Sequence, residues 1–275
     1  MRGLGVTRAA AGSVPHALVP LLAAFTYLGA PSVLVALAAS VHWFGPRLGL
    51  RRERDAPRLL AVGLVLFGVV VALKATFALP RPPAGVELVA ADGYGFPSGH
   101  ATAAAAIYGG AAALFARPRR WLRWLLCGSL AAAVAASRLL LGVHYLVDVL
   151  AGALLGVVGA AVVLRATRRR PVVGFALAPF SGAAGLWIAG PTADALSGLG
   201  LGVGALAGFL LVARVGRGRV DAPLALAGYV VFGGLAALAL TAGLSAGAVL
   251  ITSGVAGAGV TALPATRPSL SRVLR

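Results

Sequence analysis

The sequence predicts an all-α fold, a polytopic membrane bundle of about nine transmembrane helices. Hydrophobic residues make up 60% of the 275 residues and charged residues only 11%, and the mean hydropathy is +0.94. Soluble domains carry about twice this share of charged residues. Apolar runs of about 20 residues, the length of a helix that crosses a bilayer, recur along the chain. The composition therefore indicates an integral protein of the cell membrane.

Each apolar run is interpreted as one crossing, and only the first is irregular. Pro20 and Pro31 interrupt it, so residues 10–28 are expected to form an interfacial or broken helix ahead of the true crossing. The expected spans are 18–42, 58–79, 98–116, 121–142, 145–165, 172–190, 196–214, 222–242 and 245–263.

The arginines between the spans predict the orientation of the bundle. Every second loop is basic. The arginines after the first, third, fifth, seventh and ninth expected spans are, in order, Arg47, Arg51, Arg52, Arg54 and Arg58; Arg117, Arg119, Arg120 and Arg123; Arg165, Arg168, Arg169 and Arg170; Arg214, Arg217 and Arg219; and Arg267, Arg272 and Arg275. Because basic loops stay in the cytoplasm, the N-terminus is expected outside and the C-terminus inside. The net charge of +17 thus reflects orientation and does not indicate a nucleic-acid partner. Only Arg81 and Arg138 fall in the expected outer loops, so these two need another explanation.

The second span ends with an unusual residue, Lys74. It is the only lysine among 24 basic residues and lies inside an apolar run. One interpretation is a side chain that extends to the membrane interface. The functional interpretation is a point charge that contacts a phosphate, with Arg81 seven residues later in the same outer loop.

The third span begins with the sequence Pro97-Ser98-Gly99-His100. The first turn of a helix offers unpaired N–H groups that suit an anion, and glycine lets the backbone approach a ligand closely. His100 is placed there to donate a proton. Taken alone, the segment also fits an ordinary helix start with Ser98 as the N-cap.

A third polar interruption, SRLLLGVHYLVD, follows at 137–148. His144 and Asp148 are four residues apart and share one face of a helix. An aspartate in this position accepts the Nδ1 proton of the histidine and leaves Nε2 free as a nucleophile. Arg138 is placed to hold an anion nearby. Ordinary interfacial residues remain the alternative for this segment.

Together, these three segments resemble the signature of the type 2 phosphatidic acid phosphatase superfamily, over roughly 58–165. The resemblance implies that His144 is the nucleophile and forms a phosphohistidine, that Asp148 orients it, and that His100 protonates the leaving group. The phosphate-binding residues implied by the resemblance are Lys74, Arg81, Ser98, Gly99 and Arg138. No metal and no cofactor are expected, and the active site is expected on the extracytoplasmic face.

The same resemblance divides the chain into three expected parts. Residues 1–57 form an N-terminal segment with the first span, 58–170 the phosphatase core, and 171–275 an additional four-helix membrane region. Nine spans with an outer N-terminus are similar to the glucose-6-phosphatase branch, whereas the motif spacing and short outer loop are more similar to prokaryotic lipid phosphatases.

Small residues at helical spacing are interpreted as packing positions; they are Gly152 and Gly156, and then Gly198, Gly200, Gly202, Gly204 and Gly208.

Two classes of function follow from these observations. The favoured one is a phosphatase for a membrane lipid phosphate or diphosphate, namely polyprenyl diphosphate, phosphatidate or phosphatidylglycerophosphate; a glucose-6-phosphatase-like sugar-phosphate phosphatase is the alternative enzyme. The other class is a non-catalytic membrane scaffold or transporter, which the absence of ionisable residues inside the last four spans disfavours. The sequence predicts no oligomeric state.

Overall fold

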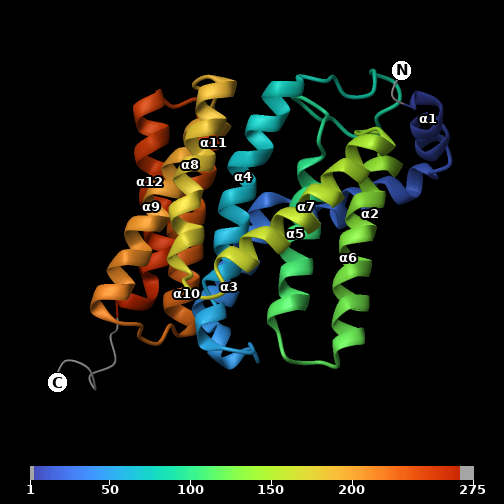
Figure 1. Cartoon of the computed structure of the whole chain (residues 1–275). Coiled ribbons are helices and arrows are strands. Elements are labelled where there is room, and N and C mark those ends of the chain that lie inside the picture. The colour runs from blue at the N-terminus through green and yellow to red at the C-terminus, as the bar shows by residue number, and fades with distance from the viewer. Residues whose placement is uncertain (1–2, 267–275) are drawn as a thin grey trace. The chain divides into compact units, whose positions relative to one another are not determined.

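The computed structural model describes residues 3–266, and all regular elements in this range are helical. The arginines at 267, 272 and 275 that contribute to the orientation argument lie outside the described residues. The α-helices (Figure 1) are α1 (Leu4–Gly12), α2 (Val19–Thr26), α3 (Pro31–Phe44), α4 (Arg58–Phe77), α5 (Gly99–Leu114), α6 (Arg120–Leu140), α7 (Leu146–Ala166), α8 (Val172–Ala189), α9 (Ala193–Val215), α10 (Ala222–Gly228), α11 (Gly234–Thr241) and α12 (Ala246–Ala262). A single π-helical turn, Tyr229–Gly233, joins α10 to α11.

Within 3–266, seven helical segments are long and apolar enough to cross a membrane, or eight if one bent pair counts as a span. The seven agree with seven of the expected spans to within a few residues. The expected total of nine is not confirmed. The segments are Glu53–Phe77, Arg120–Leu140, Leu146–Ala166, Val172–Ala189, Ala193–Val215, Ala222–Thr241 and Ala246–Ala265.

The two remaining expected spans are helical but short or broken. In the first, Ala30 adopts an extended conformation with ψ 136° because Pro31 follows it, and the helix starts anew at Pro31. Further upstream, Leu4–Gly12 and His16–Gly29 meet at 91°, which agrees with the broken helix expected there. The break lies before His16, however, and Pro20 does not cause it, because Pro20 lies in the first turn of α2, where proline is tolerated. The other expected span, 98–116, is the 16-residue helix α5.

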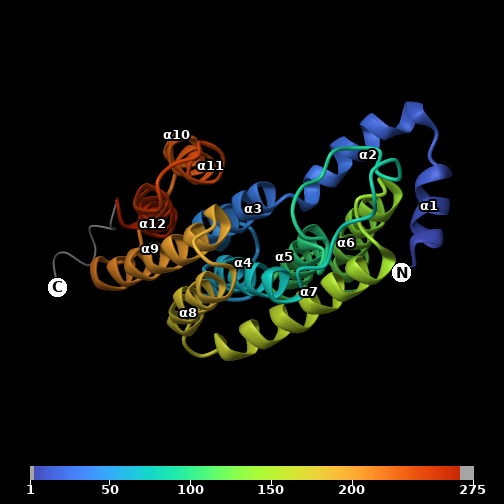
Figure 2. The ribbon, with the colours of Figure 1, turned by 90° about the horizontal axis from the view of Figure 1, so that it is seen from above.

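The chain forms two compact units, and helices α3, α4 and α7 contribute residues to both. The first unit consists of the residues up to Leu34 together with Leu73–Val162, and the second of Val35–Ala72 and the residues from Val163 onward. In the first unit, α1, α2 and α5 all pack against α6 (Figures 1 and 2). This unit contains all three of the polar segments identified in the sequence.

Glycines bring α5 and α7 together in the first unit. A Cβ atom added at Gly152 would lie 2.5 Å from the carbonyl oxygen of Ser98, and one added at Gly156 would overlap the carbonyl oxygen of Thr102. The packing role predicted for Gly152 and Gly156 is thus confirmed. These contacts hold the beginning of α5 against the first three turns of α7.

In the second unit, α9 packs against both α8 and α12. Gly198 lies against Gly182 of α8, and a Cβ at Gly204 would overlap the backbone of Gly254 in α12. The glycines of α9 therefore serve close packing, as predicted.

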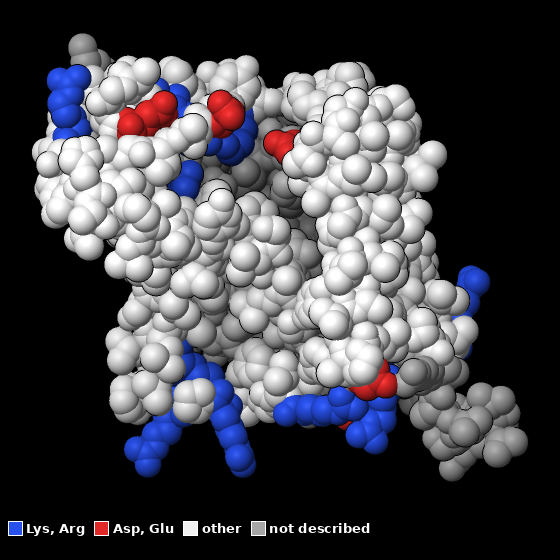
Figure 3. Space-filling view, turned by 180° about the vertical axis from the view of Figure 1, so that it is seen from behind, with Lys and Arg blue, Asp and Glu red and all other residues white. Residues whose placement is uncertain are grey.

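The outer surface of the helices is apolar, as a lipid environment requires. On α7, Leu150, Leu154 and Val157 are each more than half exposed. The face in Figure 3 is mostly uncharged, with its charged side chains gathered near the ends. With its apolar helices, this surface characterises a multi-pass membrane protein.

Candidate active site

The candidate site lies where the loop between α4 and α5 meets the turn between α6 and α7. The backbone N–H of Leu88 donates a hydrogen bond of 2.9 Å to the carbonyl of Leu141. The next residue, Gly142, has φ +70°, and a Cβ there would overlap the carbonyl oxygen of Val86. Only glycine adopts this conformation without cost and leaves room for so close a contact. The loop is therefore fixed against the turn that carries His144.

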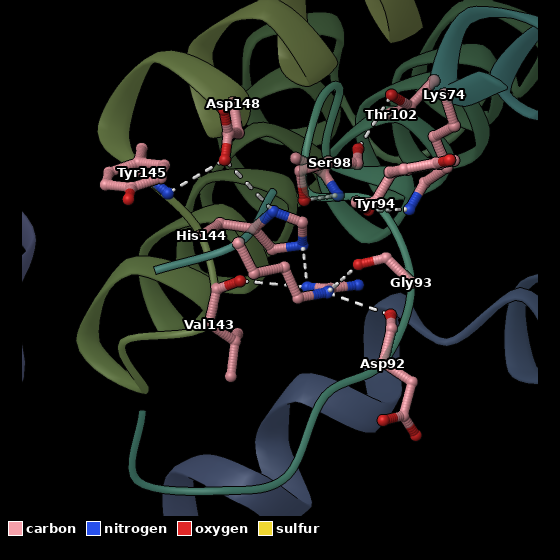
Figure 4. A network of polar contacts seen from close by, with 12 residues as sticks. Lys74, Asp92, Gly93, Tyr94, Ser98, Thr102, Val143, His144, Tyr145 and Asp148 are labelled. Atoms are coloured by element: carbon pink, nitrogen blue, oxygen red, sulfur yellow. Dashed lines mark hydrogen bonds and ion pairs between the residues drawn. The ribbon is translucent and has the colours of Figure 1, made fainter. Parts of the chain in front are cut away.

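His144 is 1% exposed and lies between α6 and α7. Its Nε2 atom is 3.0 Å from an Nη atom of Arg81. Figure 4 shows the ring of His144 beside the side chain of Asp148. Because a guanidinium only donates hydrogen bonds, Nε2 must accept this one and carries no proton. The neutral imidazole then has its proton on Nδ1, which faces Oδ2 of Asp148 at 3.6 Å. This distance exceeds a hydrogen bond, so the pair is an electrostatic contact that a shift of about half an ångström would close.

Asp148 owes its position to the beginning of α7. It is the third residue of the helix, and its Oδ2 accepts a 3.0 Å hydrogen bond from the backbone N–H of Tyr145. This is the return bond of a capping box, and the positive end of the helix dipole stabilises the carboxylate there. The carbonyl of Asp148 also accepts from the N–H of Ser98 at 3.0 Å. The fully buried carboxylate is thus held in place beside His144.

Arg81 is oriented by backbone carbonyls. Its Nε donates to the carbonyls of Asp92 and Gly93 at 3.0 and 3.1 Å, and the Nη atom that contacts His144 also donates to the carbonyl of Val143 at 2.9 Å. Nζ of Lys74 similarly donates to the carbonyl of Tyr94 at 2.7 Å. Carbonyl oxygens fix these cations without neutralising their charge. The Arg81 guanidinium therefore lies beside His144 and keeps its positive charge for an anion.

Arg138, in the last turn of α6, is 7% exposed. One Nη atom donates to Oγ1 of Thr26 at 3.2 Å. Its Nε–H is buried and has no hydrogen-bond partner among residues 3–266. A buried donor left unpaired on a charged group is costly, and an anionic ligand would satisfy it.

The beginning of α5 supplies the remaining predicted residues. The fully buried Ser98 caps the helix, with its Oγ accepting from the N–H of Ala101 at 3.5 Å. Gly99 is the first helical residue, and His100 follows it. Burial lowers the pKa of His100, and the charges of Arg138, His144, Arg81 and Lys74 lower it further. Ser98 is thus an N-cap, as its alternative interpretation predicted, and its contribution to phosphate binding stays a prediction.

Burial lowers the pKa of His144 to about 4, and Asp148 opposes this effect while Arg81, Arg138 and Lys74 add to it. At neutral pH the imidazole is therefore uncharged, and its Nε2 lone pair is available. All eight predicted site residues belong to the first unit. The groups that act electrostatically on His144 come from the first and third motifs, and His144 itself acts on His100 of the second motif.

Two substitutions are expected to move the pH profile in opposite directions. The positive charge of Arg81 lowers the pKa of His144, so Arg81→Gln raises that pKa and the activity falls off at a higher pH on the acid side. Asp148 raises the pKa, so Asp148→Asn lowers it and moves the acid limb to a lower pH. The measurement is kcat/KM across the acidic and neutral range, where titration of the substrate itself is common to all variants. Shifts of both variants in one direction would contradict the assignment.

Three features of the site were not identified from the sequence. Thr26 contacts Arg138 from a distant segment and carries no recognisable signal. The Tyr145 N–H bond lacks the usual Ser or Thr of a capping box. Gly142 did carry a recognisable signal in the sequence, because a helix often ends at a glycine in the left-handed conformation.

The segment that carries the three motifs matches a known protein family. The family model of the PAP2 superfamily, the type 2 phosphatidic acid phosphatases, matches residues 57–171. This segment, which contains all three polar segments of the site, therefore has the sequence pattern of that superfamily. Among solved structures, the chain is similar to the crystal structure of a transmembrane PAP2-type phosphatidylglycerolphosphate phosphatase from Bacillus subtilis. The identity is 26% and the TM-score 0.54, over 61% of this chain and 85% of that one. The comparison with curated protein sequences gives no match.

Proposed function

We propose that the protein hydrolyses a lipid phosphate or diphosphate at the extracytoplasmic face of the membrane, through a phosphohistidine on His144. The observation that carries the proposal is the state of His144. Its buried Nε2 carries no proton and faces a guanidinium, while its Nδ1 faces a fixed carboxylate. This arrangement is that of an activated nucleophile beside an anion-binding group.

In the first half-reaction, the phosphate binds against Arg81, Arg138 and Lys74. One of its oxygens replaces Nε2 as the acceptor of the Arg81 N–H. The Nε2 lone pair attacks phosphorus, an N–P bond forms and the P–O bond to the leaving group breaks. Asp148 stabilises the positive charge that develops on the imidazole. The negative charge of the bound phosphate offsets the cations that act on His100 and so favours protonated His100, which gives its proton to the leaving oxygen.

In the second half-reaction, the now neutral His100 takes a proton from water. The oxygen of that water attacks phosphorus, and the N–P bond breaks with its electron pair returning to Nε2. Inorganic phosphate leaves, and His100 is again protonated. Phosphoryl transfer depends mainly on positioning and charge stabilisation, which the three cations supply.

We expect activity without a metal ion. The charged groups around Nε2 are chiefly cations, which repel a metal, and Asp148 is already engaged with Tyr145 and His144. Phosphate release is therefore expected to continue at its full rate in excess chelator. Loss of activity that Mg²⁺ restores would contradict this prediction.

Helix α6 supports the proposed face. It has 21 residues, or about 30 Å at 1.5 Å per residue, which equals the thickness of the hydrocarbon core. Arg119, Arg120 and Arg123 lie at its beginning and Arg138 at its end. If the basic end is cytoplasmic, the site is on the outer side.

A lipid substrate is favoured over a sugar phosphate. A lipid headgroup at the membrane surface reaches this site by lateral diffusion, whereas a sugar phosphate needs a mouth open to water. The similar protein from Bacillus subtilis acts on phosphatidylglycerolphosphate, so this lipid comes first, ahead of phosphatidate and polyprenyl diphosphate.

The decisive experiment is an assay of phosphate release from these three lipids and from glucose 6-phosphate. The wild type and His144→Ala are compared in the same detergent. We expect release from at least one lipid by the wild type alone. Equal release by both proteins would refute the role of His144, and a preference for the sugar would refute the lipid proposal.

A further inference from the structure

We propose that Thr26 is a positioning residue for Arg138, so that an N-terminal segment outside the PAP2 match completes the phosphate site. The inference rests on the proposed function in one respect, namely that Arg138 binds phosphate. It adds a residue that precedes the matched region of 57–171 by about thirty positions.

The contact itself is direct and buried. Oγ1 of Thr26 accepts a 3.2 Å hydrogen bond from an Nη atom of Arg138, and each residue is 7% exposed. Thr26 is the last residue of α2, which packs against α6. The interaction therefore joins two elements that are far apart in the sequence.

The segment around Thr26 is fixed against both α5 and α6. The hydroxyl of Tyr108 in α5 donates a 2.8 Å hydrogen bond to the carbonyl of Leu28. A Cβ atom added at Gly29 would overlap the side chain of Val134 in α6. Thr26 is consequently held at a set distance from both helices, and its hydroxyl is a fixed acceptor.

Arg138 needs such an acceptor because Arg81 is a neighbouring like charge. Before an anion binds, repulsion between the two guanidinium groups favours their separation. A carboxylate would hold Arg138 but would also neutralise it, whereas a hydroxyl holds it and leaves the charge intact. The buried Nε–H of Arg138 remains unpaired among residues 3–266 and is thereby kept for a phosphate oxygen.

The test compares Thr26→Val, which removes the hydroxyl and keeps the shape, with Thr26→Ser, which restores it. Thr7→Val is the matched control, because the Thr7 hydroxyl is equally buried in the same N-terminal segment and has no partner in the described range. The readouts are kcat and KM on the lipid substrate and the inhibition constant of inorganic phosphate. Elution volume and thermal midpoint in detergent confirm that each variant is folded.

We expect Thr26→Val to weaken both kcat/KM and phosphate inhibition by about 10-fold, the effect of one lost hydrogen bond to a charged group. Thr26→Ser is expected to recover most of this loss, and Thr7→Val to show none. Unchanged phosphate inhibition in Thr26→Val would overturn the inference, as would a loss that Thr26→Ser does not recover.

A fourth variant, Arg138→Gln, separates failure of the inference from failure of the proposed function. If Arg138→Gln loses phosphate inhibition and Thr26→Val does not, only the inference is wrong. If phosphate inhibits Arg138→Gln as strongly as the wild type and the variant turns over at the wild-type rate, the proposed phosphate site is wrong. The role proposed for Thr26 is then wrong as well.

Discussion

Replacing His144 by alanine is expected to reduce phosphate release by about 10⁴-fold or more, the usual consequence of removing a nucleophile. The reason is geometric. His144 is the residue whose unprotonated nitrogen faces Arg81 while its other nitrogen faces Asp148. Alanine has no nitrogen in its side chain, so the variant has no nucleophile at that position. The matched control is His16→Ala, because His16 is exposed and remote in sequence from the three motifs.

The covalent intermediate offers a sharper version of this test. With p-nitrophenyl phosphate, whose leaving group needs little protonation, His100→Ala is expected to form the phosphohistidine but to hydrolyse it slowly. Labelled phosphate should then accumulate on the protein in a bond that acid breaks and alkali spares. The label should be absent from His144→Ala. Label that persists in His144→Ala, or a bond stable to acid, would contradict the assigned nucleophile.

The elements of this protein were predictable where a single physical property dominates. A membrane-spanning helix such as α7 needs about 20 apolar residues, and hydropathy alone locates such a run in the sequence. The motif residues stood out because charged groups such as Lys74 are rare and costly in an apolar run. The short α5 and the break at Ala30 were harder, since they depend on where capping and a following proline end a helix.

The contacts that complete the site lie beyond what a motif encodes. Arg81 is held by the carbonyls of Asp92, Gly93 and Val143, a group that every residue carries whatever its side chain. The partner of Arg138 lies 112 positions away. Neither interaction leaves a mark on the composition of the segment that provides it.

The basic loops show a related limit. Arg123 was interpreted as an orientation signal, yet it is 4% exposed. It donates to the carbonyls of Ala112, Ala116 and Pro118, where α5 ends. One arginine thus serves the helix terminus as well as the charge asymmetry, because the last carbonyls of a helix need donors. Arg58 is likewise buried and pairs with Asp55.

Substituting Gly152 by alanine is the second change expected to have a large effect, about 100-fold on kcat. The added Cβ would lie 2.5 Å from the carbonyl oxygen of Ser98, so the beginning of α5 must move away from α7. His100 sits on α5, whereas Asp148 begins α7 and orients His144. A displacement of about 1 Å between an acid and a nucleophile costs roughly two orders of magnitude in rate.

The chain supplies a matched control for this change in Gly109, which lies in α5 with nothing within 4 Å of an added Cβ. Gly109→Ala is expected to keep its full rate and to gain about 0.5–1 kcal/mol in stability, since alanine is the better helix former. For Gly152→Ala, overpacking is expected to cost about 1–3 kcal/mol. The measurements are kcat, phosphate inhibition and the thermal midpoint for both variants. A Gly152→Ala protein that turns over like Gly109→Ala would show that the distance between α5 and α7 does not set the rate, and the assignment of His100 as the proton donor would then have to be abandoned.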